Sequence, residues 1–286
     1  MKELVIVSGK GGTGKTCVAG SLAVLAENKV LADCDVDAAN LHLLAGPRKT
    51  QKEPFFGLPK AVIEKDKCQE CRLCEKLCRF GAIGNFKVDP LKCEGCAVCF
   101  HACPADAVKI TDRQAGYLLV SDTEYGPLVH ARLGIAEGNS GKLVSIVRQR
   151  AKEIAEKEGF GLIITDGPPG IGCPVISSLS GADLVLAVTE PTVAGVHDLE
   201  RVLSLVEHFG IKAAVCINKW DLNPENTLAI EFFCDREKIA LAGKIPYDPA
   251  VTEAVRQNSP VVRNGSGPAA QAILNLWDNL KNLLSS

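Results

Sequence analysis

Eight cysteines between residues 68 and 103 follow one spacing twice, and this repeat constrains the fold more than any other feature of the sequence. The two runs lie 25 positions apart and consist of Cys68, Cys71, Cys74 and Cys78, then Cys93, Cys96, Cys99 and Cys103. The segment 81–83 that follows the first run has a counterpart at 106–108 after the second. We therefore expect two copies of one small unit that pack face to face, with the closely spaced thiols acting as metal ligands.

The spacing resembles that of bacterial ferredoxins with two [4Fe–4S] clusters, in which the fourth cysteine of each run binds the other cluster. The resemblance implies an inserted, small α+β ferredoxin-like module over residues 60–112. It also implies two ligand sets, which are Cys68, Cys71, Cys74 and Cys103 for one cluster and Cys78, Cys93, Cys96 and Cys99 for the other. Zinc is the alternative, although a tetrahedral zinc site usually takes paired Cys-x2-Cys ligands and would leave the middle thiolates without a role.

A glycine-rich loop at residues 9–16 predicts a nucleotide site. The loop lies between an apolar strand expected at 4–8 and a helix expected at 15–27, which is the setting of a phosphate-binding loop. The N–H groups of its glycines can surround phosphates, Lys15 can reach the terminal phosphates, and Thr16 can bind Mg²⁺. The residues expected to contact ATP here are Gly11, Gly12, Thr13, Gly14, Lys15, Thr16 and Cys17.

An additional lysine early in this loop, Lys10, resembles the deviant Walker A motif of the MinD/ParA superfamily of ATPases. That superfamily also includes the nitrogenase iron protein and the Mrp-type cluster carriers. The resemblance implies ATP hydrolysis, with Lys10 reaching the phosphates that a partner subunit binds. It therefore implies a dimer that forms on ATP binding, either from two copies of this chain or with a paralogue. A loop lysine in solvent is the alternative.

Two strand ends resemble the switch regions of the same family. By this resemblance Asp35 activates the attacking water and Asp33 supports the Mg²⁺ shell, while Asp166 lies near Mg²⁺ through a water and Gly170 lies near the γ-phosphate. The implied catalytic residues are Lys10, Lys15, Asp35 and Asp166, and the implied magnesium shell is Thr16, Asp33 and Asp166. A helix cap or a simple turn is the alternative for these segments.

The base of the nucleotide has a candidate site at two later positions. Asn218 and Lys219 close an apolar strand and resemble the adenine-recognition position of the family. Pro246 and Asp248 resemble the loop that packs over the base. Ordinary turn chemistry is the alternative, because asparagine is common where strands end.

Short apolar segments alternate with helical stretches outside the cysteine block. The segments at 30–33, 162–166, 184–188 and 213–218 are largely apolar on both faces, and a helical stretch follows each. This alternation predicts an α/β fold with a doubly wound, mostly parallel sheet, which the resemblance assigns to the P-loop NTPases. We expect the ATPase in two parts, residues 1–59 and 113–286, with a linker at 46–59 and an exit from the insertion at 111–116.

Charge and hydropathy limit the partners. The formal net charge of −2 gives no general attraction to nucleic acid or anionic membranes, and we expect neither as a stable partner. No apolar run reaches the roughly 18 to 20 residues that a membrane-spanning helix needs, and no signal-peptide pattern is present, so we expect a soluble, cytoplasmic protein. The apolar face of a helix expected at 273–284 should pack on the ATPase core.

The five cysteines outside the block are expected to be small buried residues, and they are Cys17, Cys34, Cys173, Cys216 and Cys234. Cys173 has a second interpretation, because the nitrogenase iron protein carries a ligand of its bridging cluster at a matching distance after the switch aspartate. No cysteine between Cys103 and Cys173 supplies a second ligand. A redox or metal role of Cys173 is therefore a weaker hypothesis than packing.

The combined patterns predict an enzyme whose ATP cycle gates two clusters. Electron transfer to a partner metalloprotein is the first hypothesis, by resemblance to the nitrogenase iron protein. A carrier or scaffold for iron–sulfur or molybdenum-containing clusters, similar to Mrp proteins, is the second. A spatial organiser similar to MinD and ParA is the third. The expected cofactors are ATP, Mg²⁺ and two [4Fe–4S] clusters, and the expected partner is a redox or metal-cluster protein.

Overall fold

The computed structural model describes residues 1–134 and 140–285, which fold into two compact units. The large unit comprises Met1–Lys52, Leu118–Ala131 and the chain from Ser140 onward. The cysteine unit comprises Glu53–Tyr117 and the described part of Arg132–Asn139. The module expected over residues 60–112 lies within the cysteine unit. The boundaries between the units fall inside three strands, β3 (Lys49–Phe56), β8 (Gln114–Thr123) and β9 (Gly126–Leu133).

The central sheet has the strand order β13-β12-β11-β1-β10-β2-β9-β8-β3. All neighbouring strands from β13 to β9 pair in parallel. A short turn joins β8 to β9, which requires an antiparallel pair. The other strands are β1 (Lys2–Ser8), β2 (Lys29–Asp33), β10 (Leu162–Pro169), β11 (Leu184–Thr189), β12 (Lys212–Asn218) and β13 (Ala240–Ile245). The prediction of an α/β fold with a mostly parallel sheet is confirmed.

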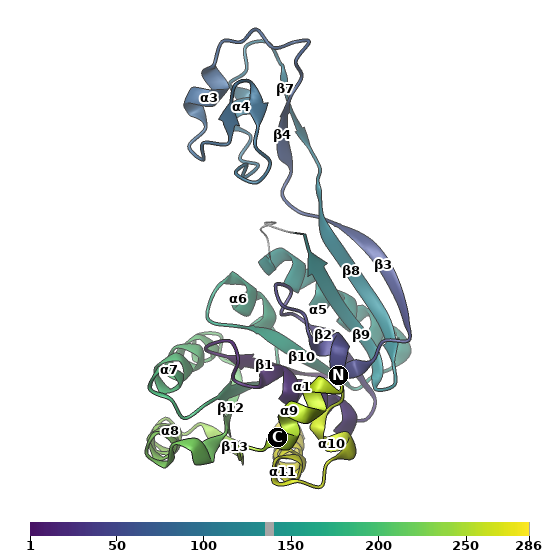
Figure 1. Cartoon of the computed structure of the whole chain (residues 1–286), viewed down its shortest axis with the longest axis vertical. Coiled ribbons are helices and arrows are strands. Elements are labelled where there is room, and N and C mark those ends of the chain that lie inside the picture. Colours follow the sequence, from purple (N-terminus) through teal and green to yellow (C-terminus); the bar gives the residue numbers. More distant parts are fainter. Residues whose placement is uncertain (135–139, 286) are drawn as a thin grey trace. The chain divides into compact units, whose positions relative to one another are not determined.

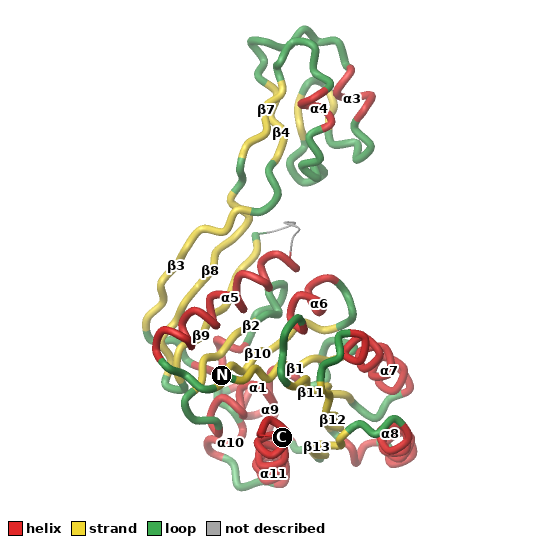
Figure 2. Tube along the Cα trace, turned by 180° about the vertical axis from the view of Figure 1, so that it is seen from behind, coloured by secondary structure: helices red, strands yellow, loops and turns green. Residues whose placement is uncertain are grey.

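Helices cover both faces of this sheet (Figures 1 and 2). They do so because the strand residues that point to either face are apolar and must be buried. Leu4 and Ile6 of β1 face one layer, and Val5 and Val7 face the other. The first layer contains α1 (Lys15–Leu25), α2 (Leu41–Ala45), α9 (Pro249–Arg256), α10 (Val261–Asn264) and α11 (Pro268–Ser285). The second contains α5 (Ser140–Glu158), α6 (Cys173–Leu179), α7 (Val193–His208) and α8 (Pro224–Arg236).

The C-terminal helix α11 packs on the core, as its apolar face predicts. Ile273, Leu276 and Leu280 are buried in the cluster that also contains residues of α1. Gly243 of β13 allows the close approach, since a Cβ at that position would lie 3.3 Å from Leu276. Among residues 1–134 and 140–285, none of the helices combines the length and the apolar character that crossing a lipid bilayer requires.

The segment 46–59 contains the strand β3, so the expectation of a linker is wrong for Lys49–Phe56. This strand is the last in the sheet, and Phe55 is its one buried residue. An edge strand with both faces in solvent needs no apolar alternation, and it tolerates Pro54. Neither signal of a buried strand is therefore present in its sequence.

The cysteine unit is built from two small antiparallel ribbons and two short helices. One ribbon pairs β4 (Lys60–Ile63) with β7 (Val108–Thr111), and the other pairs β5 (Ile83–Gly84) with β6 (Lys87–Val88). The helices are α3 (Leu73–Leu77) and α4 (Val98–His101). A small core of Ala61, Ala82, Ile83, Cys93, Cys99 and Val108 holds them together.

The two halves of the cysteine unit share one backbone conformation. Positions 25 apart have matching left-handed φ angles, with 55° at Glu70 and 67° at Gly95, 59° at Arg72 and 61° at Ala97, and 59° at Gly81 and 49° at Asp106. The halves also exchange equivalent backbone hydrogen bonds, from Glu64 N to Ala107 O and from Asp89 N to Ala82 O. The repeat in the sequence is therefore a repeat in the structure.

Candidate nucleotide and cysteine sites

The glycine loop joins the carboxyl end of β1 to the start of α1. Gly12 and Gly14 have φ angles of 82° and 90°, which residues with a Cβ rarely adopt. A Cβ on Gly14 would also lie 2.3 Å from Nδ2 of Asn218, whereas no described atom lies within 4 Å of a Cβ built on Gly11 or Gly12. The loop thus packs tightly against Asn218 at Gly14 and is open at Gly11 and Gly12, where its N–H groups can bind an anion.

Lys15 begins α1 and is only 6% exposed. Its Nζ lies 2.8 Å from Asp166 Oδ1 and 3.8 Å from Asp35 Oδ2. Burial by itself lowers the pKa of Lys15, but the nearby carboxylates of Asp166 and Asp35 outweigh burial and hold the pKa above its usual value. The ammonium group is therefore charged at neutral pH.

Two buried polar atoms near this lysine lack a hydrogen-bond partner among the described residues, Thr13 Oγ1 and Asp166 Oδ2. Leaving such an atom unpaired costs about 1–3 kcal/mol, so an incoming group that pairs with it is favoured. A phosphate oxygen can accept a hydrogen bond from the Thr13 hydroxyl. A water bound to Mg²⁺ can donate to the Asp166 carboxylate.

Asp33 is the last residue of β2 and Asp35 follows the strand, and their carboxylate oxygens have different partners. Asp33 is fully buried, and its two oxygens accept hydrogen bonds from the N–H groups of Asp35 and Leu41 over 3.2 and 3.0 Å. Burial, reinforced by the charge of Asp166, raises the pKa of Asp33 well above its usual value. Burial also raises the pKa of Asp35, against the opposing charge of Lys15. Asp33 thus shapes the segment that presents Asp35 to the lysine.

Lys10 contacts two residues that sequence reasoning missed. Its Nζ donates to Thr192 Oγ1 over 3.2 Å and lies 3.7 Å from Glu190 Oε2. The other Glu190 oxygen lies 2.6 Å from Lys219 Nζ. Thr192 is also the N-cap of α7, where its hydroxyl accepts from Gly195 N. The signal that could have found Glu190 is its position just after β11, since ligands of parallel sheets bind at the carboxyl ends of strands.

The expected base site lies at the ends of β12 and β13. The Asn218 amide donates to Thr13 O over 2.8 Å and so joins β12 to the phosphate loop. Asp248 is the N-cap of α9, and its two oxygens accept from Ala250 N and Ala269 N. Asp248 therefore shapes the loop that contains the half-buried Pro246.

The remaining residues expected to contact ATP are near the glycine loop. Thr16 and Cys17 follow it in sequence, and a hydrogen bond joins Gly170 to the strand before it. Gly170 has a φ of 91°, and its N–H donates to Ser8 O over 2.8 Å, which joins the end of β10 to the end of β1. Thr16 and Cys17 lie in the first turn of α1 and are partly buried. Burial raises the pKa of the Cys17 thiol, so this group is neutral at pH 7.

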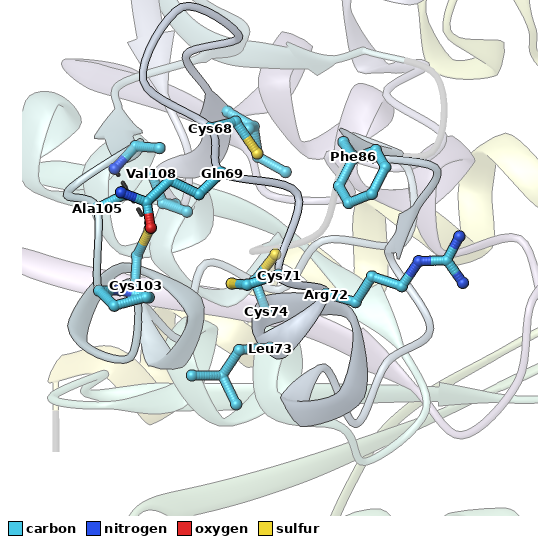
Figure 3. Close-up of a pocket in the computed structure, with 13 residues that line it drawn as sticks. Cys68, Gln69, Cys71, Arg72, Leu73, Cys74, Phe86, Cys103, Ala105 and Val108 are labelled. Atoms are coloured by element: carbon cyan, nitrogen blue, oxygen red, sulfur yellow. Dashed lines mark hydrogen bonds between the residues drawn. The ribbon is translucent and has the colours of Figure 1, made fainter.

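One pocket of the cysteine unit is lined by Cys68, Cys71, Cys74 and Cys103 (Figure 3). Apolar residues such as Ile63, Phe86 and Val108 complete its wall. The N–H group of Ala107 donates to Cys103 Sγ over 3.3 Å. Three cysteines of the first run and the last cysteine of the second thus surround one space.

A second pocket is lined by Cys78, Cys93, Cys96 and Cys99. Its wall includes Ala61, Ala82 and Ile83, and the N–H group of Ala82 donates to Cys78 Sγ over 3.3 Å. Within the part of the chain that the structure describes, no three His, Cys, Asp or Glu side chains converge on a single metal ion.

The scattered cysteines divide into two groups. Cys34, Cys216 and Cys234 are buried, as expected of small packed residues, whereas Cys17 is only partly buried. Cys173 is exposed at the first position of α6, so the expectation of a packed residue is wrong there. The exposure follows from the start of α6, where no preceding helical turn covers the side chain.

Comparison with known families decides what the glycine loop belongs to. Residues 4–261 match the family described as the CobQ/CobB/MinD/ParA nucleotide binding domain. The chain belongs to this family. It is a P-loop ATPase, and the family match spans the sequence on both sides of the cysteine unit.

Individual relatives agree with this membership. An uncharacterized protein of Methanocaldococcus jannaschii is 32% identical, over 99% of this chain and 97% of its own length. The septum site-determining protein MinD of Neisseria meningitidis is 25% identical, over 95% of this chain and 88% of its own length. The structure of MinD from Pyrococcus horikoshii, complexed with Mg-ADP, superposes with a TM-score of 0.61 at 20% identity, covering 99% of this chain and 96% of that one. The last comparison supports the fold.

Proposed function

We propose that this CobQ/CobB/MinD/ParA-family ATPase carries two [4Fe–4S] clusters and uses its ATP cycle to control electron transfer from them to a partner metalloprotein. One observation carries the proposal. Each of the two cysteine pockets gathers three thiols from one run and the fourth thiol from the other run. That exchange is the ligand pattern of two-cluster ferredoxins, and it has no use in two separate zinc sites.

The residues of the pockets fit a cluster of four irons. Among the described residues no three of these thiols are placed to bind one metal ion, which needs its sulfurs about 2.3 Å from a single point. The N–H groups of Ala82 and Ala107 donate to the sulfurs of Cys78 and Cys103. Cys71 and Cys96 are exposed, while Cys93 and Cys99 are buried. Hydrogen bonds to sulfur and solvent exposure both tune cluster potentials. Each bound cluster would supply one-electron chemistry.

The nucleotide site fits ATP with Mg²⁺. Lys15 supplies a charged ammonium group, Thr13 a buried hydroxyl without a partner, and Asp166 a carboxylate oxygen without a partner among the described residues. Thr16 and Asp166 would hold the Mg²⁺, the latter through a water, with Asp33 behind them. Asp35 would orient the attacking water, since phosphoryl transfer depends mainly on positioning and charge. Asn218, Lys219, Pro246 and Asp248 would surround the base.

The dimer that forms on ATP binding is part of the proposal. Lys10 already pairs with Glu190 and Thr192, so its transfer to the phosphates of a partner subunit would require these contacts to break. The interaction energy of such a partly exposed pair is only about 0–1 kcal/mol, which a phosphate contact can exceed. The partner subunit would be a second copy or a paralogue.

The first test is the metal content of protein purified without oxygen. We expect about eight iron atoms and eight sulfides per chain, four of each for every cluster. The variant Cys71→Ala should lose about half of both, whereas Cys234→Ala, which replaces a buried cysteine of the large unit, should keep them. Stoichiometric zinc without iron, or equal losses in the two variants, would refute the proposal.

A spatial-organiser function is a second candidate, because MinD proteins are among the relatives. It predicts that MgATP makes the protein sediment with anionic vesicles. The electron-transfer proposal predicts no such ATP-dependent sedimentation. A third candidate, cluster carriage, predicts that the protein passes its clusters to an apo-ferredoxin and loses iron as it does so.

A further inference from the structure

The cysteine unit carries a cationic groove beside β4 and β6. The groove encloses about 950 Å³, including the part open to solvent. Four of its lining residues are cationic, and they are Lys60, Lys65, Lys87 and Arg113. Asp112 is the one carboxylate among the described lining residues. Val62, which is 46% exposed, adds apolar surface at the same place.

This concentration of positive charge is not a property of the whole unit. Residues 60–112 contain nine Lys or Arg and eight Asp or Glu, which is close to neutral. Three of those nine cations, Lys60, Lys65 and Lys87, line the groove, against one of the eight acids. A surface of one sign beside apolar residues attracts and orients a partner of the opposite sign.

The groove shares walls with both cysteine pockets. Ala61 lines the groove and the pocket of Cys78, Cys93, Cys96 and Cys99. Ile63 and Phe86 line the groove and the pocket of Cys68, Cys71, Cys74 and Cys103. In addition, Lys60 Nζ donates to Cys93 O over 2.6 Å. A molecule in the groove would therefore be separated from each cysteine set by single side chains.

We propose that this groove is the docking site for an electron-transfer protein with an acidic surface. The proposal rests on the clusters of the proposed function. With clusters bound, a reduced [4Fe–4S] cluster would give one electron to the one-electron carrier of the docked protein and return to its oxidised state. The lysines hold the acidic partner, and the shared walls keep the transfer distance short.

A different role for the same lysines is distinguishable. Cations beside a thiolate-bound cluster can offset its negative charge, and their removal would then lower the cluster potential. Docking instead affects the second-order rate constant and its salt dependence. Lys65 and Lys87 are the residues to change, because Lys60 also bonds to the backbone of Cys93.

The experiment measures electron transfer from the dithionite-reduced full-length protein by anaerobic stopped flow. A flavodoxin serves as the acidic acceptor and a basic cytochrome c as the comparison. The variant Lys65→Glu/Lys87→Glu should slow reduction of the flavodoxin at least about tenfold at low ionic strength, and salt should remove the difference. The control Lys76→Glu/Lys92→Glu has the same net charge and changes residues of the same unit that do not line the groove.

Each outcome decides the matter. Equal slowing of flavodoxin reduction by both double variants, or no slowing by either, overturns the docking site. It is also overturned if a change in the measured cluster potential accounts for the slower rate of the Lys65→Glu/Lys87→Glu variant. Competition by millimolar inorganic phosphate that sodium chloride of equal ionic strength does not reproduce would assign the groove to small anions and overturn it too. Flavodoxin binding is also measured by calorimetry. If the protein contains no clusters but still binds flavodoxin in a way that depends on Lys65 and Lys87, only the proposed function is refuted and the docking site stands.

Discussion

Three glycines of the nucleotide loop allow a graded test of how that loop is built. A Cβ on Gly11 meets nothing within 4 Å, so Gly11→Ala should leave the free energy of unfolding within about 0.5 kcal/mol of the wild type. Gly12 has open space but a φ of 82°, so Gly12→Ala should cost about 1 kcal/mol in backbone strain. Gly14→Ala combines the strain of a φ of 90° with a contact of 2.3 Å to Asn218. It should cost about 2–4 kcal/mol, because the hydrogen bond from Asn218 to Thr13 O is also lost.

Urea unfolding without nucleotide measures this series, and titration with a fluorescent ATP analogue measures binding on the same samples. Gly11→Ala should fold normally yet bind ATP at least about tenfold more weakly, because its methyl group enters the space left for the phosphates. Gly14→Ala should lose both stability and binding. Equal unfolding free energies for the Gly11→Ala and Gly14→Ala variants would refute the reasoning.

Further predictions concern the core, the pH response and the ligand exchange. Arg148 forms a buried ion pair with Glu3 over 2.7 Å, so Arg148→Met should lower the free energy of unfolding in urea by about 3 kcal/mol. Adding Glu3→Gln should recover part of that loss, and no recovery would contradict this account of the pair. Burial, with a smaller contribution from His42, lowers the pKa of His130 to about 4. Because the unfolded chain has the higher pKa of about 6.5, stability should fall as pH drops from about 6.5 to 4, by about 3 kcal/mol at most. His130→Asn should flatten that part of the pH profile, and an unchanged profile would contradict the assignment. The Cys103→Ala and Cys74→Ala variants should lose the same cluster and therefore show the same remaining EPR spectrum. If the spectrum of Cys103→Ala matches that of Cys99→Ala instead, the assignment of Cys103 to the cluster of the first run is contradicted.

The chemistry-bearing loops were predictable because they follow buried strands. The apolar run before the glycine loop marks the carboxyl edge of a parallel sheet, and so do the acids at the end of β2 and in the second half of β10. The two ligand sets were expected only from the resemblance to two-cluster ferredoxins, whereas the repeat itself could be read from the sequence. The spacing of each run repeats, and the backbone repeats with it, down to the left-handed residues Arg72 and Ala97.

Other features depended on tertiary contacts that no local pattern records. The edge strand β3 has an exposed, charged sequence, so its place in the sheet comes from the neighbouring β8. Glu190 and Thr192 contact Lys10 across 180 and more positions of sequence, which only the closing of the sheet brings about. The cationic groove likewise collects lysines from β4, from the turn after it and from β6, and the near-neutral composition of the segment conceals it.

The central claim is that one polypeptide joins an ATPase to two [4Fe–4S] clusters. Its most direct test is a redox titration of the anaerobically purified protein, followed by EPR, with and without MgATP. The account predicts two reducible [4Fe–4S] clusters per chain whose spectrum or potential shifts with MgATP, and no shift in the Lys15→Ala variant. Clusters that respond identically in the presence and absence of MgATP, or a chain that binds no iron, would contradict it.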